Sequence, residues 1–315
     1  MDPCCHHPDG EKQTPAVAVG GARQSSRMPL ILWGAAAVVA VAWLYLFGLP
    51  RQEATAPAAA GAAADVTSAV LPAGGITVAI DWGDTGTRLV ETGAIDMEKY
   101  RQYYGDGQSR ELLSYLTDTQ GTGITINEDN AQFWVNTLWA LGLVQKSQVL
   151  DEGVMGTDYR AELGNFASTG GWTLGAKPAV DLYSSAELVP LTAQQQQLVQ
   201  KISEGVYRPC CGNSTAFPDC NHGMAALGLI ELMVSQGAAE DDIYRALLAF
   251  NSYWFTQTYL DLAYYFQTYE NTAWADVDPR RVLSAEFSSA QGYQKIKQRI
   301  GTIPGTEGQG SSCSA

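Results

Sequence analysis

The most apolar stretch of the chain is an uncharged run, residues 30–49, with the sequence LILWGAAAVVAVAWLYLFGL. As a helix rising 1.5 Å per residue, it would be about 30 Å long, the thickness of a bilayer's hydrocarbon core. Trp33, Trp43 and Tyr45 stand near its ends, where interfacial aromatic residues occur. We therefore predict one transmembrane helix over 30–49, which anchors the chain to membrane lipid.

Basic residues around this segment predict its direction. Arg23 and Arg27 precede it, whereas only Arg51 follows closely, with Glu53 after it. By the positive-inside rule, the N-terminus is cytoplasmic and the main domain is extracytoplasmic, in a single-pass protein of the cell membrane. A cleaved signal peptide is the alternative, because an Ala-rich stretch follows the run, but its apolar region would be shorter.

Composition divides the rest of the chain. Residues 1–29 are predicted to be a disordered cytoplasmic tail, and residues 50–74 an Ala/Pro-rich linker. Residues 75–300 contain the apolar periodicity of a folded domain. Residues 301–315 are predicted to be a flexible Gly/Ser tail that carries Cys313.

Helical spacing and capping residues recur through the domain. Asn127 is placed to cap a long helix over EDNAQFWVNTLWALGLVQK, which has one broad apolar face. Thr192 and Gln195 form a capping box for a later helix, and Gly205 is placed to end it. The fold is therefore predicted to be mainly α, in one globular domain.

Three further elements follow from pattern. Residues 223–236 have apolar side chains at helical spacing, and Gly237 is placed to end that helix. A long aromatic helix is predicted to start at Glu240 and to continue towards Tyr269. The best strand candidate is residues 76–82, ITVAIDW.

The net charge of −14 narrows the class of partner. Residues 1–50 carry three basic and three acidic side chains, so the whole excess lies beyond residue 50. An acidic domain lacks the basic face that meets phosphates, so we predict no nucleic-acid partner.

The candidate chemistry lies in YRPCCGNSTAFPDCNHGMAALG, residues 207–228. This segment holds Cys210, Cys211, Cys220 and His222, and its Pro, Gly, Asn and Ser residues predict a loop between two helices. Cys220 would then lie at or near a helix N-terminus, where partial positive charge lowers the pKa of a thiol. The positive charge of Arg208 would also lower the pKa of nearby thiols.

Three interpretations of this loop remain open. It is a structural disulfide staple, in which Cys210 or Cys211 pairs with Cys220 in an oxidising compartment. It is a site for Zn or Cu(I) with Cys210, Cys211, Cys220 and His222 as ligands. Or it is a thiol–disulfide exchange site, in which Cys210, Cys211 and Cys220 react and His222 accepts a proton.

Cys313 favours the exchange interpretation. A flexible tail of about a dozen residues has a root-mean-square reach of roughly 20 Å. The tail thiol is therefore predicted to visit the loop and to act as a resolving cysteine.

The N-terminal segment MDPCCHHPD is a second group of soft ligands. Cys4, Cys5, His6 and His7 are predicted to lie on the other side of the membrane, so they cannot join the first site in one molecule. They are expected to bind metal weakly or to belong to a disordered tail.

Residues 203–248 resemble the membrane-anchored thiol-reductase subunit of cytochrome c maturation. Arg208, Cys210 and Cys211 stand near that family's R-C-x-x-C motif, and QGAAEDDIYRALL (236–248) matches its later turn. The cysteines here are adjacent rather than two apart, and Cys220 and His222 are additional. The resemblance implies a small helical bundle that reduces a partner protein's disulfide outside the membrane.

Together these features predict a membrane-anchored protein that performs thiol-based redox chemistry or handles Cu or Zn. The alternative is a non-catalytic scaffold, in which the loop is a staple and the aromatic helix 244–269 packs against a membrane partner. The sequence leaves open whether the protein is an enzyme.

Overall fold

A computed structural model describes residues 66–107 and 109–301 of the chain. The predicted membrane segment 30–49, the N-terminal cysteines and Cys313 lie outside the described residues. Within the part that is described, no helix is both long enough and apolar enough to cross a bilayer. The predictions of an anchor, a topology and a tail thiol therefore stay predictions.

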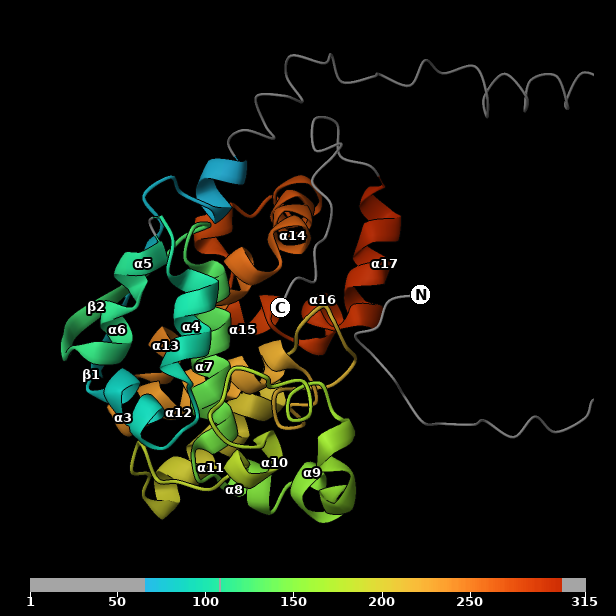
Figure 1. Ribbon diagram of the computed structural model, residues 1–315. Helices are drawn as coiled ribbons and strands as arrows, with labels where there is room; N and C mark the ends of the chain where they lie inside the picture. Colours follow the sequence, from blue (N-terminus) through green and yellow to red (C-terminus); the bar gives the residue numbers. More distant parts are fainter. Residues whose placement is uncertain (1–65, 108, 302–315) are drawn as a thin grey trace, which may run out of the picture.

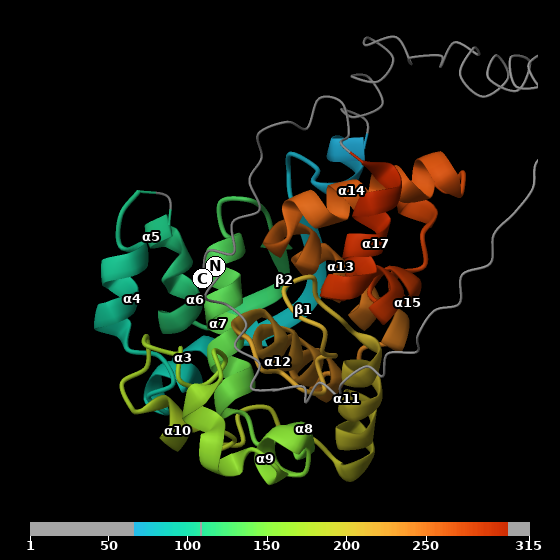
Figure 2. The same cartoon turned by 90° about the vertical axis from the view of Figure 1, so that its right-hand side faces the viewer.

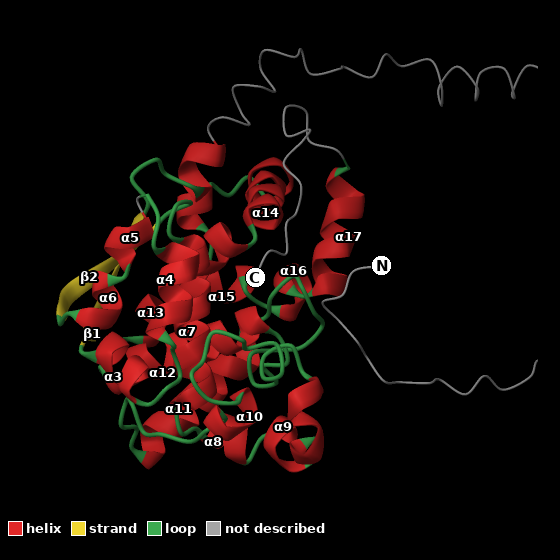
Figure 3. Cartoon of the chain, viewed as in Figure 1, coloured by secondary structure: helices red, strands yellow, loops and turns green. Residues whose placement is uncertain are grey.

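The described domain is mainly helical, as the sequence predicts, with one antiparallel pair of strands at its edge (Figure 1, Figure 3). Its first elements are β1 (Ile76–Gly83), α3 (Thr85–Glu91), α4 (Met97–Tyr104), α5 (Ser109–Leu112), α6 (Ser114–Thr117), β2 (Gln120–Ile126), α7 (Ala131–Val144), α8 (Gln148–Asp151), α9 (Val154–Thr157), the 3-10 helix η1 (Arg160–Asn165) and α10 (Ala179–Leu182). The remaining elements are α11 (Ala193–Gly205), α12 (Asn221–Ser235), α13 (Glu240–Trp254), α14 (Thr256–Tyr269), the 3-10 helix η2 (Trp274–Asp276), α15 (Pro279–Val282), α16 (Ala285–Ser288) and α17 (Ala290–Ile300).

The end of the predicted linker packs into this domain. Residues 66–70 are helical, and Val66, Val70 and Leu71 are buried in the core. Their burial shows that the packed unit includes residues from Val66 on, nine residues upstream of the predicted boundary at 75.

Strand β1 confirms the predicted strand at 76–82. Its alternate side chains Val78, Ile80 and Trp82 are buried, which is the period of a half-buried strand. Its partner is β2, with Ile76 opposite Ile126 and a register shift between Val78 and Asp81. The sequence analysis missed β2.

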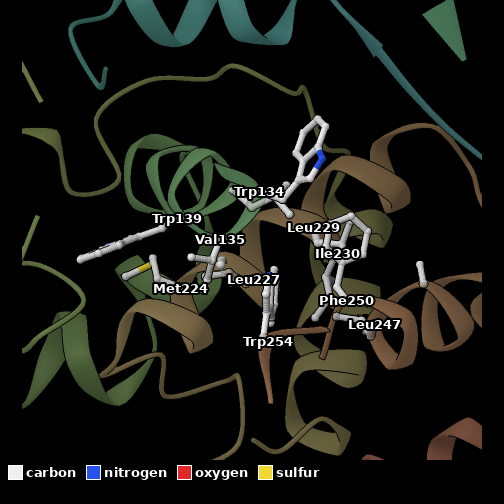
Figure 4. Close-up of a cluster of buried hydrophobic side chains, with 14 of the residues drawn as sticks. Trp134, Val135, Trp139, Met224, Leu227, Leu229, Ile230, Leu247, Phe250 and Trp254 are labelled. Atoms are coloured by element: carbon white, nitrogen blue, oxygen red, sulfur yellow. The ribbon is translucent and has the colours of Figure 1, made fainter. Parts of the chain in front are cut away.

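Helices α7 and α12 form the centre of the domain (Figure 2). They approach closely where Gly142 meets Gly228: a Cβ built on Gly228 would lie 2.5 Å from the Leu138 carbonyl oxygen. Both helices are buried on nearly all sides. Helix α13 packs on the same core, and Figure 4 shows Trp134 of α7, Leu227 of α12 and Phe250 of α13 within one cluster.

Helix ends agree with the sequence where local capping decides them. The predicted capping box of Thr192 and Gln195 is present at the start of α11. Helix α12 ends at Ser235, just before Gly237, whose φ of 73° suits glycine. Helix α7 begins later than predicted, because Asn127 and Asn130 exchange side-chain to backbone hydrogen bonds in a turn ahead of it.

The predicted aromatic helix from Glu240 to Tyr269 is wrong in one respect. It is two helices, α13 and α14, which break at Phe255 (φ −133°, ψ 53°). The break lets Phe255 turn towards His222, with ring centroids 4.4 Å apart. Tertiary packing therefore decides this boundary, since no glycine or proline marks it.

Candidate functional site

The loop between α11 and α12 brings three thiols together. The sulfur of Cys220 lies 3.4 Å from that of Cys210 and 3.8 Å from that of Cys211. The sulfurs of Cys210 and Cys211 are 3.7 Å apart. A disulfide has a sulfur–sulfur length of about 2.05 Å, so no two of these three residues are bonded to each other.

A buried guanidinium organises the loop. Arg208 is 1% exposed, and its Nε donates to Cys220 Sγ at 3.1 Å. Its terminal nitrogens donate to the carbonyl oxygens of Asn213 and Phe217, each at 3.1 Å, and to Asp219 Oδ1 at 2.7 Å. The loop therefore folds around a cation whose donors are shared between a sulfur, a carboxylate and two carbonyls.

The first turn of α12 fits against this guanidinium. Cys220 is the N-cap residue, and its sulfur accepts a hydrogen bond from the Gly223 backbone N–H at 3.3 Å. A Cβ on Gly223 would lie 2.5 Å from the Arg208 guanidinium carbon. Glycine at this position therefore makes room for the cation beneath the helix.

The three thiols differ in acidity. Hydrogen bonds from Cys210 and Cys211, with the charge of Arg208, lower the pKa of Cys220 well below its usual value, although burial opposes this. Donating to the neighbouring sulfurs raises the pKa of Cys210, and burial adds to that rise. The pKa of Cys211 is also raised, since donation to Cys220 and burial outweigh the hydrogen bond from Cys210. Cys220 is therefore the most acidic of the three thiols and the first to lose its proton.

His222 stands beside the cluster rather than in it. The three sulfurs form a group of possible ligand atoms within 4.8 Å of one another, and among the described residues neither His222 nor any carboxylate joins that group. The His222 Nδ1 lies 2.9 Å from Asn221 Oδ1, and the ring packs against Phe255 and Trp254. Burial lowers its pKa to about 4, so the imidazole is neutral at physiological pH.

Backbone hydrogen bonds fix the loop to distant elements. The Ala290 N–H, at the start of α17, donates to the Cys211 carbonyl at 2.9 Å. The Ser168 N–H donates to the Asp219 carbonyl at 3.0 Å, and the Tyr207 N–H donates to the Leu283 carbonyl at 2.8 Å. The cluster is therefore held by the tertiary structure and not by the loop alone.

The arrangement can hold a metal ion or act as a thiol site. Thiolates are soft ligands that suit Zn and Cu(I). A depressed thiol pKa next to a second thiol also suits disulfide exchange. These are two of the three interpretations that the sequence leaves open, and the sulfur separations show no Cys210–Cys220 or Cys211–Cys220 bridge, which the third, a disulfide staple, requires.

Sequence reasoning located the cysteines and Arg208 but missed three supporting residues. Gly223 clears space for the guanidinium, Asp219 pairs with it, and Phe255 covers His222. The signal for the first was present, because a glycine in the first turn of a helix needs a packing reason. The roles of Asp219 and Phe255 depend on tertiary contacts, which the local sequence does not indicate.

Comparisons with protein-family models, with curated proteins and with solved structures found no match to the chain. The resemblance to the thiol-reductase subunit of cytochrome c maturation therefore stays a prediction. The case for function depends on the cluster itself.

Proposed function

We propose that this protein binds a soft metal ion, Zn(II) or Cu(I), through Cys210, Cys211 and Cys220. The observation that carries the proposal is the separation of the three sulfurs, 3.4–3.8 Å. Thiolates about 2.3 Å from a tetrahedral zinc ion stand about 3.8 Å apart, so the cluster resembles three corners of such a site.

The charges around the cluster support a cation with several thiolates. Arg208 lies against Cys220 and pairs with Asp219, so this ion pair adds little net charge. Three thiolates would otherwise repel each other in a buried loop, and a bound cation removes that repulsion. Since the pKa values of Cys210 and Cys211 are raised, metal uptake should release protons from these two thiols.

Metal titration of the full chain tests the proposal. We expect Cd(II), a spectroscopic stand-in for Zn(II), to give thiolate-to-metal absorption that saturates at one ion per loop. Each of Cys210→Ser, Cys211→Ser and Cys220→Ser should weaken binding at least about tenfold, because each removes one soft ligand. Native mass spectrometry should give the same stoichiometry.

The control is the double variant Cys4→Ser, Cys5→Ser, which makes the same chemical change outside the loop and should retain the loop-bound ion. A triad variant that binds as tightly as this control would overturn the proposal. His222→Gln tests whether the histidine is a ligand beside the three cysteines. Unchanged metal affinity excludes His222, and a loss of affinity of about tenfold would make it the fourth ligand.

A second function, thiol–disulfide exchange, is favoured by the low pKa of Cys220 and the 3.4 Å distance to Cys210. The Cys220 thiolate would attack a partner protein's disulfide, and Cys210 would then displace the reduced partner. The loop would be left with a Cys210–Cys220 disulfide. Incubation with a model disulfide, followed by peptide mass mapping, tests for that bridge; an unreacted loop contradicts this function.

We also propose that the site lies outside the cytoplasm, on the anchor predicted at 30–49. The charge asymmetry around that segment and the acidic domain support this placement. A tag fused after residue 315 tests this placement. A membrane-impermeant reagent added to intact cells should label the tag. Labelling only after the membrane is permeabilised would contradict the topology.

A further inference from the structure

A cleft of about 490 Å³ opens on the surface of the domain, and no residue of the thiol loop 207–228 lines it. Its walls come from α13, from residues 274–280, which include η2 and the start of α15, and from Ile76 at the start of β1. Helices α13 and α15 lie side by side (Figure 2). Clefts that bind small molecules have volumes of about 300–1,000 Å³, so this one is large enough for such a ligand.

Apolar side chains form part of the cleft lining. Ala249 and Val277 are buried, whereas Leu248 and Trp274 are half-buried and keep part of their surface accessible. The Trp274 ring packs edge-on against Tyr259, with ring centroids 6.4 Å apart, which restrains its orientation. An indole ring offers a ligand both an apolar surface and a π face that attracts cations.

Both arginines that line the cleft are already paired with carboxylates. The Arg280 Nη1 lies 2.5 Å from Asp241 Oδ1, and its Nη2 lies 3.7 Å from Glu240 Oε2. The Arg245 Nη1 lies 2.9 Å from Asp242 Oδ1, in the same helix. An anionic ligand would therefore have to compete with these carboxylates for either arginine.

The aspartates of the cleft are in excess, since three aspartates and two arginines line it. Asp278 is the N-cap of α15 and accepts a hydrogen bond from the Arg280 backbone N–H at 3.0 Å. Asp276 is exposed, and its carboxylate makes no hydrogen bond or ion pair with the described part of the chain. It belongs to the same 3-10 helix as Trp274. The cleft therefore combines an uncompensated carboxylate with an indole ring.

We propose that this cleft binds a small organic cation, an amine with an apolar body, which pairs with Asp276 and packs on Trp274. The carboxylate supplies a partner for the ammonium group, and Leu248, Ala249 and Val277 supply an apolar surface for the body. The net charge of −14 adds a field that attracts cations to the domain. The cleft shares no residue with the thiol loop, so this proposal does not depend on the metal function.

Isothermal titration calorimetry of the full chain with 2-phenylethylamine tests the proposal. Two matched compounds keep the apolar body and change the charge: 2-phenylethanol is neutral, and 3-phenylpropionate is an anion. We expect the amine to bind at least about tenfold more tightly than the alcohol, because only the amine gains an ion pair and a cation–π contact. The anion should bind most weakly of the three, because the carboxylate of Asp276 repels it.

Substitutions in the cleft separate the two contacts. Asp276→Asn should weaken binding of the amine about fivefold and leave binding of the alcohol unchanged, because it removes only the charge. Trp274→Leu should weaken binding of both compounds, because it removes the surface on which their shared body packs. The matched control Asp158→Asn makes the same change at an exposed position that does not line the cleft, and should leave both affinities as in the parent.

Four results would overturn the proposal. Equal affinities for the amine and the alcohol would show that the ligand's charge plays no part. Tighter binding of the anion would assign the cleft to anions, through Arg245 or Arg280. An Asp276→Asn variant that binds the amine as tightly as the Asp158→Asn control would remove Asp276 from the site. If none of the three compounds binds at millimolar concentration, the cleft is not a site for this class of ligand.

Discussion

Arg208 is the residue on which the geometry of the thiol loop depends. It donates to a sulfur, a carboxylate and two backbone carbonyls while almost fully buried. A guanidinium presents five donors in a planar fork, whereas lysine presents a single ammonium. A lysine at this position would keep the positive charge but could not reach all four acceptors of Arg208.

We expect Arg208→Lys to lower the free energy of unfolding by about 3 kcal/mol, because acceptors in a buried ion pair lose their donors. The pKa of Cys220 should rise as Nε no longer donates to its sulfur. Urea unfolding and the pH profile of Cys220 alkylation measure the two effects. The control Arg245→Lys, on a side chain that is 64% exposed, should change stability by less than about 0.5 kcal/mol. Equal effects in both variants would contradict this role.

Glu231 is a buried carboxyl with an unusual environment. Neither of its oxygens has a hydrogen-bond partner among the described residues, and burial raises its pKa well above the usual value, with the nearby Ser147 hydroxyl opposing. A raised pKa means that the folded state holds the proton longer than the unfolded chain. Its stabilising contribution is complete below about pH 4.5, and it is lost as pH rises through the folded pKa.

Glu231→Gln should therefore gain stability over the parent as pH rises above about 4.5, by about 1.4 kcal/mol for each pH unit until the pH reaches the folded pKa of Glu231. The difference should shrink towards pH 4, where both side chains are neutral. Thermal unfolding from pH 4 to pH 8 measures it, with the exposed Glu204→Gln as control. A difference that does not vary with pH would contradict a buried neutral carboxyl.

Individual residues were predictable where sequence neighbours create the chemistry. Cys220 gains its helix N-terminus from the local sequence, and the Pro and Gly residues around Cys210 mark the loop. The sequence also predicted that Cys210, Cys211 and Cys220 come together, but not that His222 stays outside the group or that Arg208 is buried beneath it, because both depend on tertiary packing.

At the scale of elements, the contact between α7 and α12 is the tightest constraint. Gly142 and Gly228 let the two backbones approach closely, and a Cβ on Gly228 would lie 2.7 Å from the Gly142 nitrogen. No side chain can yield there, because the obstructing atoms are backbone. The two helices would have to separate.

Gly228→Ala should destabilise the domain by about 3 kcal/mol, the upper range for overpacking in a core. The free energy of unfolding in urea measures the loss. Gly121→Ala is the matched control, since nothing lies within 4 Å of its added Cβ. A Gly228→Ala variant as stable as this control would contradict the close approach.

Elements were predictable to the extent that their own residues define them. Capping residues predicted the start of α11 and the end of α12. The alternation of apolar and polar side chains predicted β1. Strand β2, QGTGITI, carries two glycines and few apolar residues, so its assignment depends on pairing with β1. The break at Phe255 likewise depends on packing against His222, which lies on another helix.

At the scale of the whole molecule, the thiol loop joins parts that are distant in sequence. Its backbone bonds to residue 168 on one side and to Leu283 and Ala290 on the other. In Figure 2 helices α11 and α12, which flank the loop, are yellow to orange, whereas α17, whose first residue bonds to the Cys211 carbonyl, is red. A ligand that fixes the loop should therefore stabilise the entire domain rather than one segment.

Metal loading should accordingly raise the melting temperature of the full chain. At a free zinc concentration 100 times the dissociation constant, linkage gives about 2.7 kcal/mol, or roughly 5–10 °C for a domain of this size. Calorimetry with and without a chelator measures the shift, and Mg(II), which prefers oxygen ligands, should produce none. Cys211→Ser should reduce the zinc shift to about half or less, because binding that is at least about tenfold weaker gives at most about 1.4 kcal/mol at the same free zinc concentration. A zinc shift of equal size in that variant would mean that the ion binds elsewhere and that the loop is not its site.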